Sequence, residues 1–119
     1  MRTITAAAIS DTVRELCIRA NKVLTDDLTA RIETCAGCEQ SALGRSIFDD
    51  MKANLAAASE LDIPICQDTG MAVVFLEIGQ DVHIEGGLLE AAINEGVHRG
   101  YGHSLRFIQS MSLTMWETI

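Results

Sequence analysis

The only proline of this chain, Pro64, opens the stretch that most restricts the fold, PICQDTGMAVV at 64–74. Proline fixes its own backbone angle and pushes the preceding Ile63 toward an extended conformation. Gly70 can adopt the positive φ that other residues avoid. We therefore expect a rigid turn that presents polar side chains at the mouth of a sheet. These polar residues are Cys66, Gln67, Asp68 and Thr69.

Two interpretations of this turn are open from the residues alone. In the first, a thiol, a carboxamide and a carboxylate held in a rigid turn form part of a binding or catalytic site. In the second, Cys66 is a small buried hydrophobe and the polar residues after it are ordinary turn chemistry.

The residues before the proline predict three helices. The expected caps are Ser10 or Asp11 for the first and Thr25 for the second, and the third helix is expected to begin near Ser41. Apolar residues spaced by three and four continue the first helix to Leu24, and Gly37 ends the second. The third helix is expected to reach about Ala58.

The residues after the turn predict strands and a further helix. Met71–Ile78 is a nearly continuous apolar run, which favours a strand covered on both faces. Residues 82–84 predict a short second strand, and Gly86 and Gly87 lead into a helix from Leu88. The expected fold class is therefore mixed α/β: N-terminal helices followed by a strand–turn–helix segment, as part of an incomplete domain.

Charge and composition narrow the function classes. The net charge is −8 with no basic patch, which argues against nucleic-acid and anionic-membrane partners. No apolar run approaches the ~20 residues that span a bilayer, and the N-terminus lacks the apolar core of a signal peptide. We therefore expect a cytoplasmic protein with reduced cysteines.

The remaining cysteines and histidines carry weaker signals. Cys35 and Cys38 form a CxxC pair, which admits a redox or zinc interpretation, but it falls at the end of a predicted helix. His83, His98 and His103 form no zinc half-site with it. A structural role is the favoured interpretation of this pair, and Cys17 on an apolar helix stripe is expected in the core.

A longer stretch carries a family resemblance. PICQDTGMAVVFLEIGQDVHIEGG, followed by LLEAAINEGVHRGY, closely resembles the alpha-chain or N-terminal region of iron–sulfur hydro-lyases. These are the class I fumarate hydratases and the related L-tartrate dehydratases. The resemblance implies an enzyme of the EC 4.2.1 class that reversibly hydrates a dicarboxylic acid, with fumarate to malate the expected reaction. It also implies a [4Fe–4S] cofactor and a beta subunit as partner.

The resemblance assigns roles by position. Cys66 becomes one of three thiolate ligands of the cluster, whose open iron can act as a Lewis acid. Gln67 and Asp68 become active-site residues near the dicarboxylate, with Asp68 suited to proton transfer. Arg106 corresponds to the arginine of a substrate-binding Leu-Arg pair. The two other cysteine ligands of the family lie further along its chains, so these 119 residues alone are expected to be inactive.

The resemblance also suggests a domain division. Residues 1–101 are expected to be the N-terminal part of the alpha-chain domain, and 102–119 a tail that does not match. Codons for Met115–Ile119, read two bases later, accommodate Val-Gly-Asp-Asn, close to the next family motif. A change of reading frame is the hypothesis, and the coding DNA decides it. The rival functions are an inert acidic protein-interaction module and a CxxC redox or metal protein.

Overall fold

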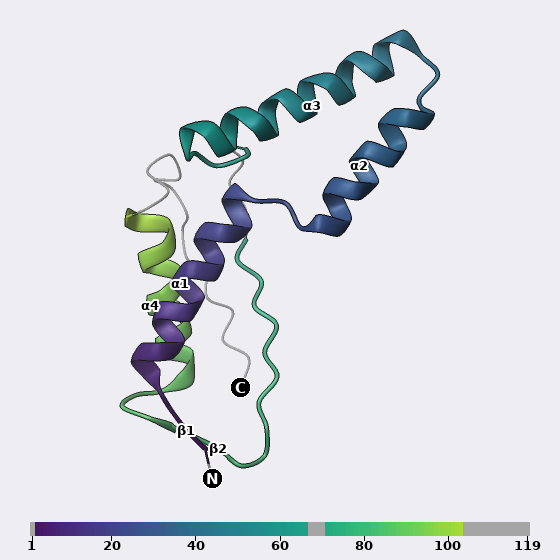
Figure 1. The fold of residues 1–119 in the computed structure, drawn as a ribbon. Helices are drawn as coiled ribbons and strands as arrows, with labels where there is room; N and C mark the ends of the chain where they lie inside the picture. The colour runs from purple at the N-terminus through teal and green to yellow at the C-terminus, as the bar shows by residue number, and fades with distance from the viewer. Residues whose placement is uncertain (1, 67–70, 104–119) are drawn as a thin grey trace. The chain divides into compact units, whose positions relative to one another are not determined.

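The computed structural model describes residues 2–66 and 71–103, and within them it has four helices and two strands (Figure 1). In chain order they are β1 (Arg2–Thr5), α1 (Ala6–Lys22), α2 (Asp26–Cys38), α3 (Ala42–Leu61), β2 (Val82–Glu85) and α4 (Leu89–His103). The mixed α/β class predicted from the sequence is confirmed.

The chain divides into two compact units. The first, which we call the sheet unit, consists of Met1–Ile18 and Gln67–Ile119. The second, the helical unit, is Arg19–Cys66. The sheet unit thus contains both strands and α4, and the helical unit contains α2 and α3.

Two parallel strands form the sheet. Arg2 lies opposite Val82 and Thr5 opposite Glu85, and the amide of Arg2 donates to the carbonyl of Asp81 at 2.9 Å. The short strand predicted at 82–84 is confirmed as β2, whereas β1 was not predicted. A four-residue strand paired with residues 80 positions away depends on a non-local contact that its own sequence does not encode.

The first helix begins earlier than the sequence predicted. Because α1 starts at Ala6, the expected cap at Ser10 or Asp11 is wrong. The side chain of Thr5 caps α1 instead, since its Oγ1 accepts a hydrogen bond from the amide of Ala8 at 3.2 Å. Ser10 lies inside the helix, buried, and its hydroxyl donates to the carbonyl of Ala92 in α4 at 2.7 Å.

Small residues let α1 and α4 approach closely. A Cβ added at Gly96 would lie 2.7 Å from the carbonyl oxygen of Ser10 and 2.7 Å from Cβ of Val13. One added at Gly100 would lie 2.8 Å from Cβ of Cys17. Glycine at these two positions is therefore a packing requirement. The core of the sheet unit gathers around this contact: Ala6, Val13, Ala92 and Val97 are the buried apolar residues among those of the unit that the structure describes.

The turn into α4 follows the sequence prediction. Gly86 has a φ of 81°, a left-handed conformation that glycine adopts without strain. Gly87 follows, and α4 begins at Leu89. The predicted turn after Gly79 is also present, with the amide of Val82 bonded to the carbonyl of Gly79 at 3.1 Å.

The predicted strand at Met71–Ile78 is wrong. These residues belong to no strand, and β1 and β2 pair only with each other in the part of the chain that the structure describes. They are also exposed rather than covered on both faces: Phe75 is 93% exposed and Met71 80%. An apolar run becomes a strand only where a neighbouring strand accepts its hydrogen bonds, and no described segment does so.

Two helices of the helical unit start where the sequence placed them. Thr25 is the N-cap of α2, and Ser41 is the N-cap of α3, with its Oγ accepting from the amide of Gly44 at 2.9 Å. The Thr25 hydroxyl hydrogen-bonds to the carboxylate of Asp27, and this bond, with the Leu28 amide, lowers the pKa of Asp27. Asp62 ends α3 in a left-handed conformation, and its amide bonds back to the carbonyl of Ala58.

Replacing Gly96 with alanine tests the helix contact. Gly96→Ala should destabilise the sheet unit by about 1–3 kcal/mol, because the methyl group collides with the backbone of α1 and with Val13. Thermal unfolding followed by circular dichroism measures the change. Gly102→Ala is the matched control: it lies in the same helix with nothing within 4 Å of the added methyl, so higher helix propensity should stabilise it by up to about 1 kcal/mol. Equal stability of both variants would contradict the close approach.

Candidate functional site

The segment that leads to Cys66 is held at several points. The amide of Ile63 bonds to the carbonyl of Ala58 at 3.0 Å, and the amide of Ile65 bonds to the carbonyl of Asn21 at 2.9 Å. The side-chain amide of Asn54, in α3, donates to the carbonyl of Ile65 at 2.8 Å. The segment is thus bonded to the end of α1 and to α3, both within the helical unit.

An ion pair adds a further link at the start of this segment. The ammonium group of Lys22, the last residue of α1, lies 2.9 Å from a carboxylate oxygen of Asp62. The lysine side chain is mostly buried, whereas that of Asp62 is mostly exposed, so water screens the attraction. The hydrogen bonds and the fixed φ of Pro64 therefore determine the path of the backbone more than this pair does.

Cys66 ends the held segment with its side chain exposed and in no disulfide. The interpretation of Cys66 as a small buried hydrophobe is therefore wrong. A solvent-accessible thiol on a backbone fixed by neighbouring hydrogen bonds is suited to metal ligation or covalent chemistry.

The other residues predicted for the site cannot be compared with it. Gln67, Asp68, Thr69 and Gly70 lie outside the described residues, and so does Arg106. The structure therefore places one of the four candidate site residues, Cys66.

The remaining cysteines differ in their surroundings. Cys17 is partly buried in α1, and this burial raises the pKa of its thiol. Cys35 is half-buried and Cys38 exposed, and both lie in the last turn of α2, which confirms that the pair is at the end of a helix.

A [4Fe–4S] cluster of the kind that the resemblance implies needs three thiolate ligands. Among residues 2–66 and 71–103, no group of three or more His, Cys, Asp or Glu side chains is arranged to hold a metal. These residues therefore do not fit a complete cluster site. The exposed thiol of Cys66 fits one ligand position.

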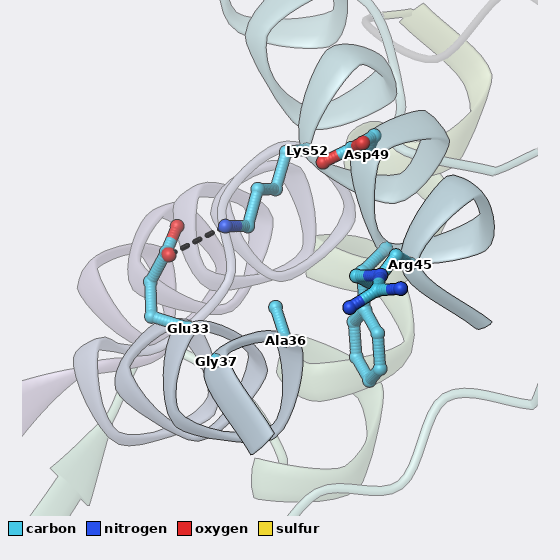
Figure 2. Close-up of a pocket in the computed structure, with 7 residues that line it drawn as sticks. Glu33, Ala36, Gly37, Arg45, Asp49 and Lys52 are labelled. Carbon is cyan, nitrogen blue, oxygen red and sulfur yellow. Dashed lines mark hydrogen bonds and ion pairs between the residues drawn. The ribbon is translucent and has the colours of Figure 1, made fainter. Parts of the chain in front are cut away.

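A hollow between α2 and α3 was not predicted from the sequence (Figure 2). It has a volume of about 250 Å³ and is lined by Glu33, Ala36, Gly37, Arg45, Phe48, Asp49 and Lys52. Across it, the ammonium group of Lys52 lies 2.6 Å from a carboxylate oxygen of Glu33. Two cations and two carboxylates balance in charge, so the hollow has no strong preference for an anion. The spacing of Arg45, Asp49 and Lys52 on one helical face is the signal that could have revealed it.

A comparison with protein families matches most of the chain. The model of the family described as "Fumarate hydratase (Fumerase)" matches residues 10–115. This range contains Cys66 and the three other candidate site residues, and it extends beyond residue 101, where the resemblance noted from the sequence ended. The chain belongs to the fumarate hydratase (Fumerase) family.

Curated relatives give a second comparison. The "Putative L(+)-tartrate dehydratase subunit alpha" of Methanocaldococcus jannaschii is 35% identical over 75 residues, which cover 63% of this chain and 26% of that protein. The L(+)-tartrate dehydratase alpha subunits of Escherichia coli K12 and Shigella boydii serotype 4 are each 31% identical over 75 residues, covering 60% of this chain and 25% of theirs. The chain spans about a quarter of the length of these relatives.

No solved structure matches the chain significantly. No helix in the described residues is long and apolar enough to cross a lipid bilayer.

Removing the Asn54 side chain tests how the segment before Cys66 is held. Asn54→Ala should weaken it by about 1 kcal/mol, because the hydrogen bond to the carbonyl of Ile65 is lost. Amide exchange at Ile65, whose own bond to Asn21 reports on the segment, should then accelerate about fivefold. Ser59→Ala, an exposed polar-to-alanine change in the same helix, should leave this rate unchanged. Equal rates in both variants would mean that the Asn54 bond does not hold the segment.

Proposed function

We propose that this chain is the N-terminal part of the alpha chain of an iron–sulfur hydro-lyase of the EC 4.2.1 class. The complete enzyme adds water to a dicarboxylic acid and removes it again, with fumarate to malate as its reaction. The observation that carries the proposal is an exposed thiol, Cys66, at the end of a hydrogen-bonded segment inside the family match.

The proposed cofactor is a [4Fe–4S] cluster in the complete enzyme, with Cys66 as one of its three thiolate ligands. The partner is a beta subunit, in keeping with the name "subunit alpha" that the curated relatives carry. We place the enzyme in the cytoplasm.

The proposed roles of the other site residues follow from their chemistry. Gln67 has an amide that can both donate to and accept from a carboxylate or hydroxyl of the substrate. Arg106 can bind a substrate carboxylate through two parallel hydrogen bonds. Asp68 moves the proton on the carbon next to the one that carries the hydroxyl, as a general base in dehydration and a general acid in hydration.

L-tartrate is the second candidate substrate, because the curated relatives named above are L(+)-tartrate dehydratase alpha subunits. Tartrate and malate share two carboxylates and a hydroxyl on the adjacent carbon, so the same three residues serve either substrate. Comparing turnover of L-malate with that of L-tartrate on one enzyme preparation decides between them.

Cys66→Ser tests the proposed ligand. The complete alpha chain that contains these residues is assembled with its beta subunit and reconstituted anaerobically with iron and sulfide. Cys66→Ser should then abolish both the visible absorbance of the cluster and the hydration activity, because serine is a poor ligand for iron–sulfur clusters. Cys38→Ser, at another exposed cysteine, is the matched control and should retain both.

The opposite outcomes identify the rival functions. A cluster retained in Cys66→Ser would overturn the ligand assignment. Assembly with a partner but without any cluster would favour the interaction module. Zinc bound through Cys35 and Cys38 would favour a CxxC metal protein.

Asp68→Asn tests the proton-transfer role. The amide cannot exchange a proton as the carboxylate does, so turnover should fall about 100-fold or more while the cluster absorbance stays unchanged. Steady-state kinetics with L-malate and fumarate measure the loss. Gln67→Ala is the comparison, and it should raise KM more than it lowers kcat. If Asp68→Asn instead raised only KM, the carboxylate would orient substrate rather than move a proton.

A further inference from the structure

Two cysteines that the proposed function does not use lie three residues apart in the last turn of α2. Both Cys35 and Cys38 are free thiols, the first half-buried and the second exposed. They belong to the helical unit, Arg19–Cys66, and the structure describes every residue of that unit. The geometry of the pair is therefore set within a single described helix.

The spacing of the pair brings the two residues onto one side of α2. Residues three apart in an α-helix have Cα atoms about 5 Å apart. Disulfides join Cα atoms that are about 4.4–6.8 Å apart, so the backbone separation is suitable. The Cβ atoms of such residues are about 5–6 Å apart in a regular α-helix, whereas a disulfide needs about 3.5–4.5 Å. A disulfide between Cys35 and Cys38 thus requires the last turn to tighten.

The last turn of α2 is free to tighten. Helices commonly end in a turn of 3₁₀-helix, in which the side chains of residues three apart lie directly above one another. Gly37, between the two cysteines, has nothing within 4 Å of an added Cβ, so open space surrounds the turn on that side. Glu39 follows as the C-cap with an extended backbone, at a ψ of 129°, so a tighter turn disturbs no further turn of this helix.

We propose that Cys35 and Cys38 form a modification site, at which a low-molecular-weight disulfide of the glutathione class oxidises the pair to an intrahelical disulfide. The exposed Cys38 attacks the oxidant as a thiolate, which gives a mixed disulfide and releases one glutathione. Cys35 then attacks the sulfur of Cys38, closes the protein disulfide and releases the second glutathione. The two cysteines lose two electrons and two protons, and oxidised glutathione takes them up. This site is separate from the hydro-lyase function proposed above.

The electrostatics of the helix end favour modification of the pair over catalysis by it. The carbonyl end of a helix carries partial negative charge, and the last turn of α2 contains no basic residue. Enzymes that catalyse disulfide exchange instead keep their attacking thiolate at a helix N-terminus or beside a cation. The pair is therefore suited to slow oxidation by a small disulfide, not to rapid exchange with other proteins.

The first experiment detects the disulfide in the full 119-residue chain. The reduced chain is equilibrated with buffers of increasing ratio of oxidised to reduced glutathione, and free thiols are then blocked with N-ethylmaleimide. Trypsin cleavage after Arg31 and Arg45 releases a peptide, residues 32–45, that contains both cysteines of the pair and neither Cys17 nor Cys66. Mass spectrometry should show this peptide lighter by two hydrogen atoms and without maleimide.

The matched control changes the spacing and keeps two thiols. The double variant Gly37→Cys/Cys38→Ser has thiols at positions 35 and 37, which do not face each other on a helix. Its equilibrium constant for disulfide closure should be lower by on the order of tenfold or more, because closure there needs a larger distortion. Mixed disulfides with glutathione should accumulate instead. Equal closure in the two chains would mean that the helix does not bring the cysteines together, and would overturn the inference.

The second experiment asks whether α2 remains a helix after oxidation. Circular dichroism of the oxidised chain should show a loss of at most about 4 helical residues, one turn. The thermal midpoint should stay within about 5 °C of that of the reduced chain. Loss of all 13 residues of α2 would mean that the disulfide forms only in an unfolded helix. A pair that stays blocked by maleimide at every glutathione ratio, or that carries two glutathiones, would mean that the thiols do not meet.

Either of these last two results would overturn the inference and would leave the role proposed for Cys66 untouched.

Discussion

The contact between α1 and α4 at Gly96 is the constraint on which the sheet unit depends. Any side chain there would meet the backbone of Ser10 and the side chain of Val13 at 2.7 Å, so only glycine permits this separation. At the same place the hydroxyl of Ser10 reaches the carbonyl of Ala92, which gives a buried polar group its partner. Because β1 runs directly into α1 and β2 leads into α4, the helix contact also holds the two parallel strands together.

The helical unit fixes the path of one backbone segment, residues 63–66. Hydrogen bonds from Ile63, Ile65 and Asn54 determine the path of the chain up to Cys66. Proline then removes the freedom of its own φ. An exposed thiol would otherwise lie on a loop with many conformations, and ordering it at the moment of ligand binding would weaken that binding. A fixed position of this kind is what the proposed role of Cys66 as a cluster ligand would need.

Local chemistry in the sequence was enough to predict several boundaries. Thr25 precedes α2 and Ser41 precedes α3, where the Ser41 side chain accepts a hydrogen bond from the amide of Gly44. Gly86 precedes α4 because it allows a positive φ. The prediction failed at Ser10, where an equally good capping residue lies inside a helix and bonds to another one. The prediction also failed at Met71–Ile78, whose residues have high strand propensity but pair with no described strand.

For the candidate site, too, the sequence predicted some features and missed others. The order of residues after Pro64 was sufficient to single out Cys66 and to relate the chain to the fumarate hydratase family, because both depend on neighbours in the sequence. The sequence did not show that the Cys66 thiol is exposed, nor which hydrogen bonds hold the residues before it. The hollow between α2 and α3 was missed for the same reason, since its ion pair joins residues 19 positions apart.

The sequence by itself determined where α2 and α3 begin, the glycine turn before α4 and the family. Each of these follows from short-range backbone preferences or from a continuous motif. Only the tertiary structure decided that β1 exists, that Ser10 is buried and that Met71–Ile78 is exposed. These features depend on contacts between residues distant along the chain, whose free energies local propensities do not contain.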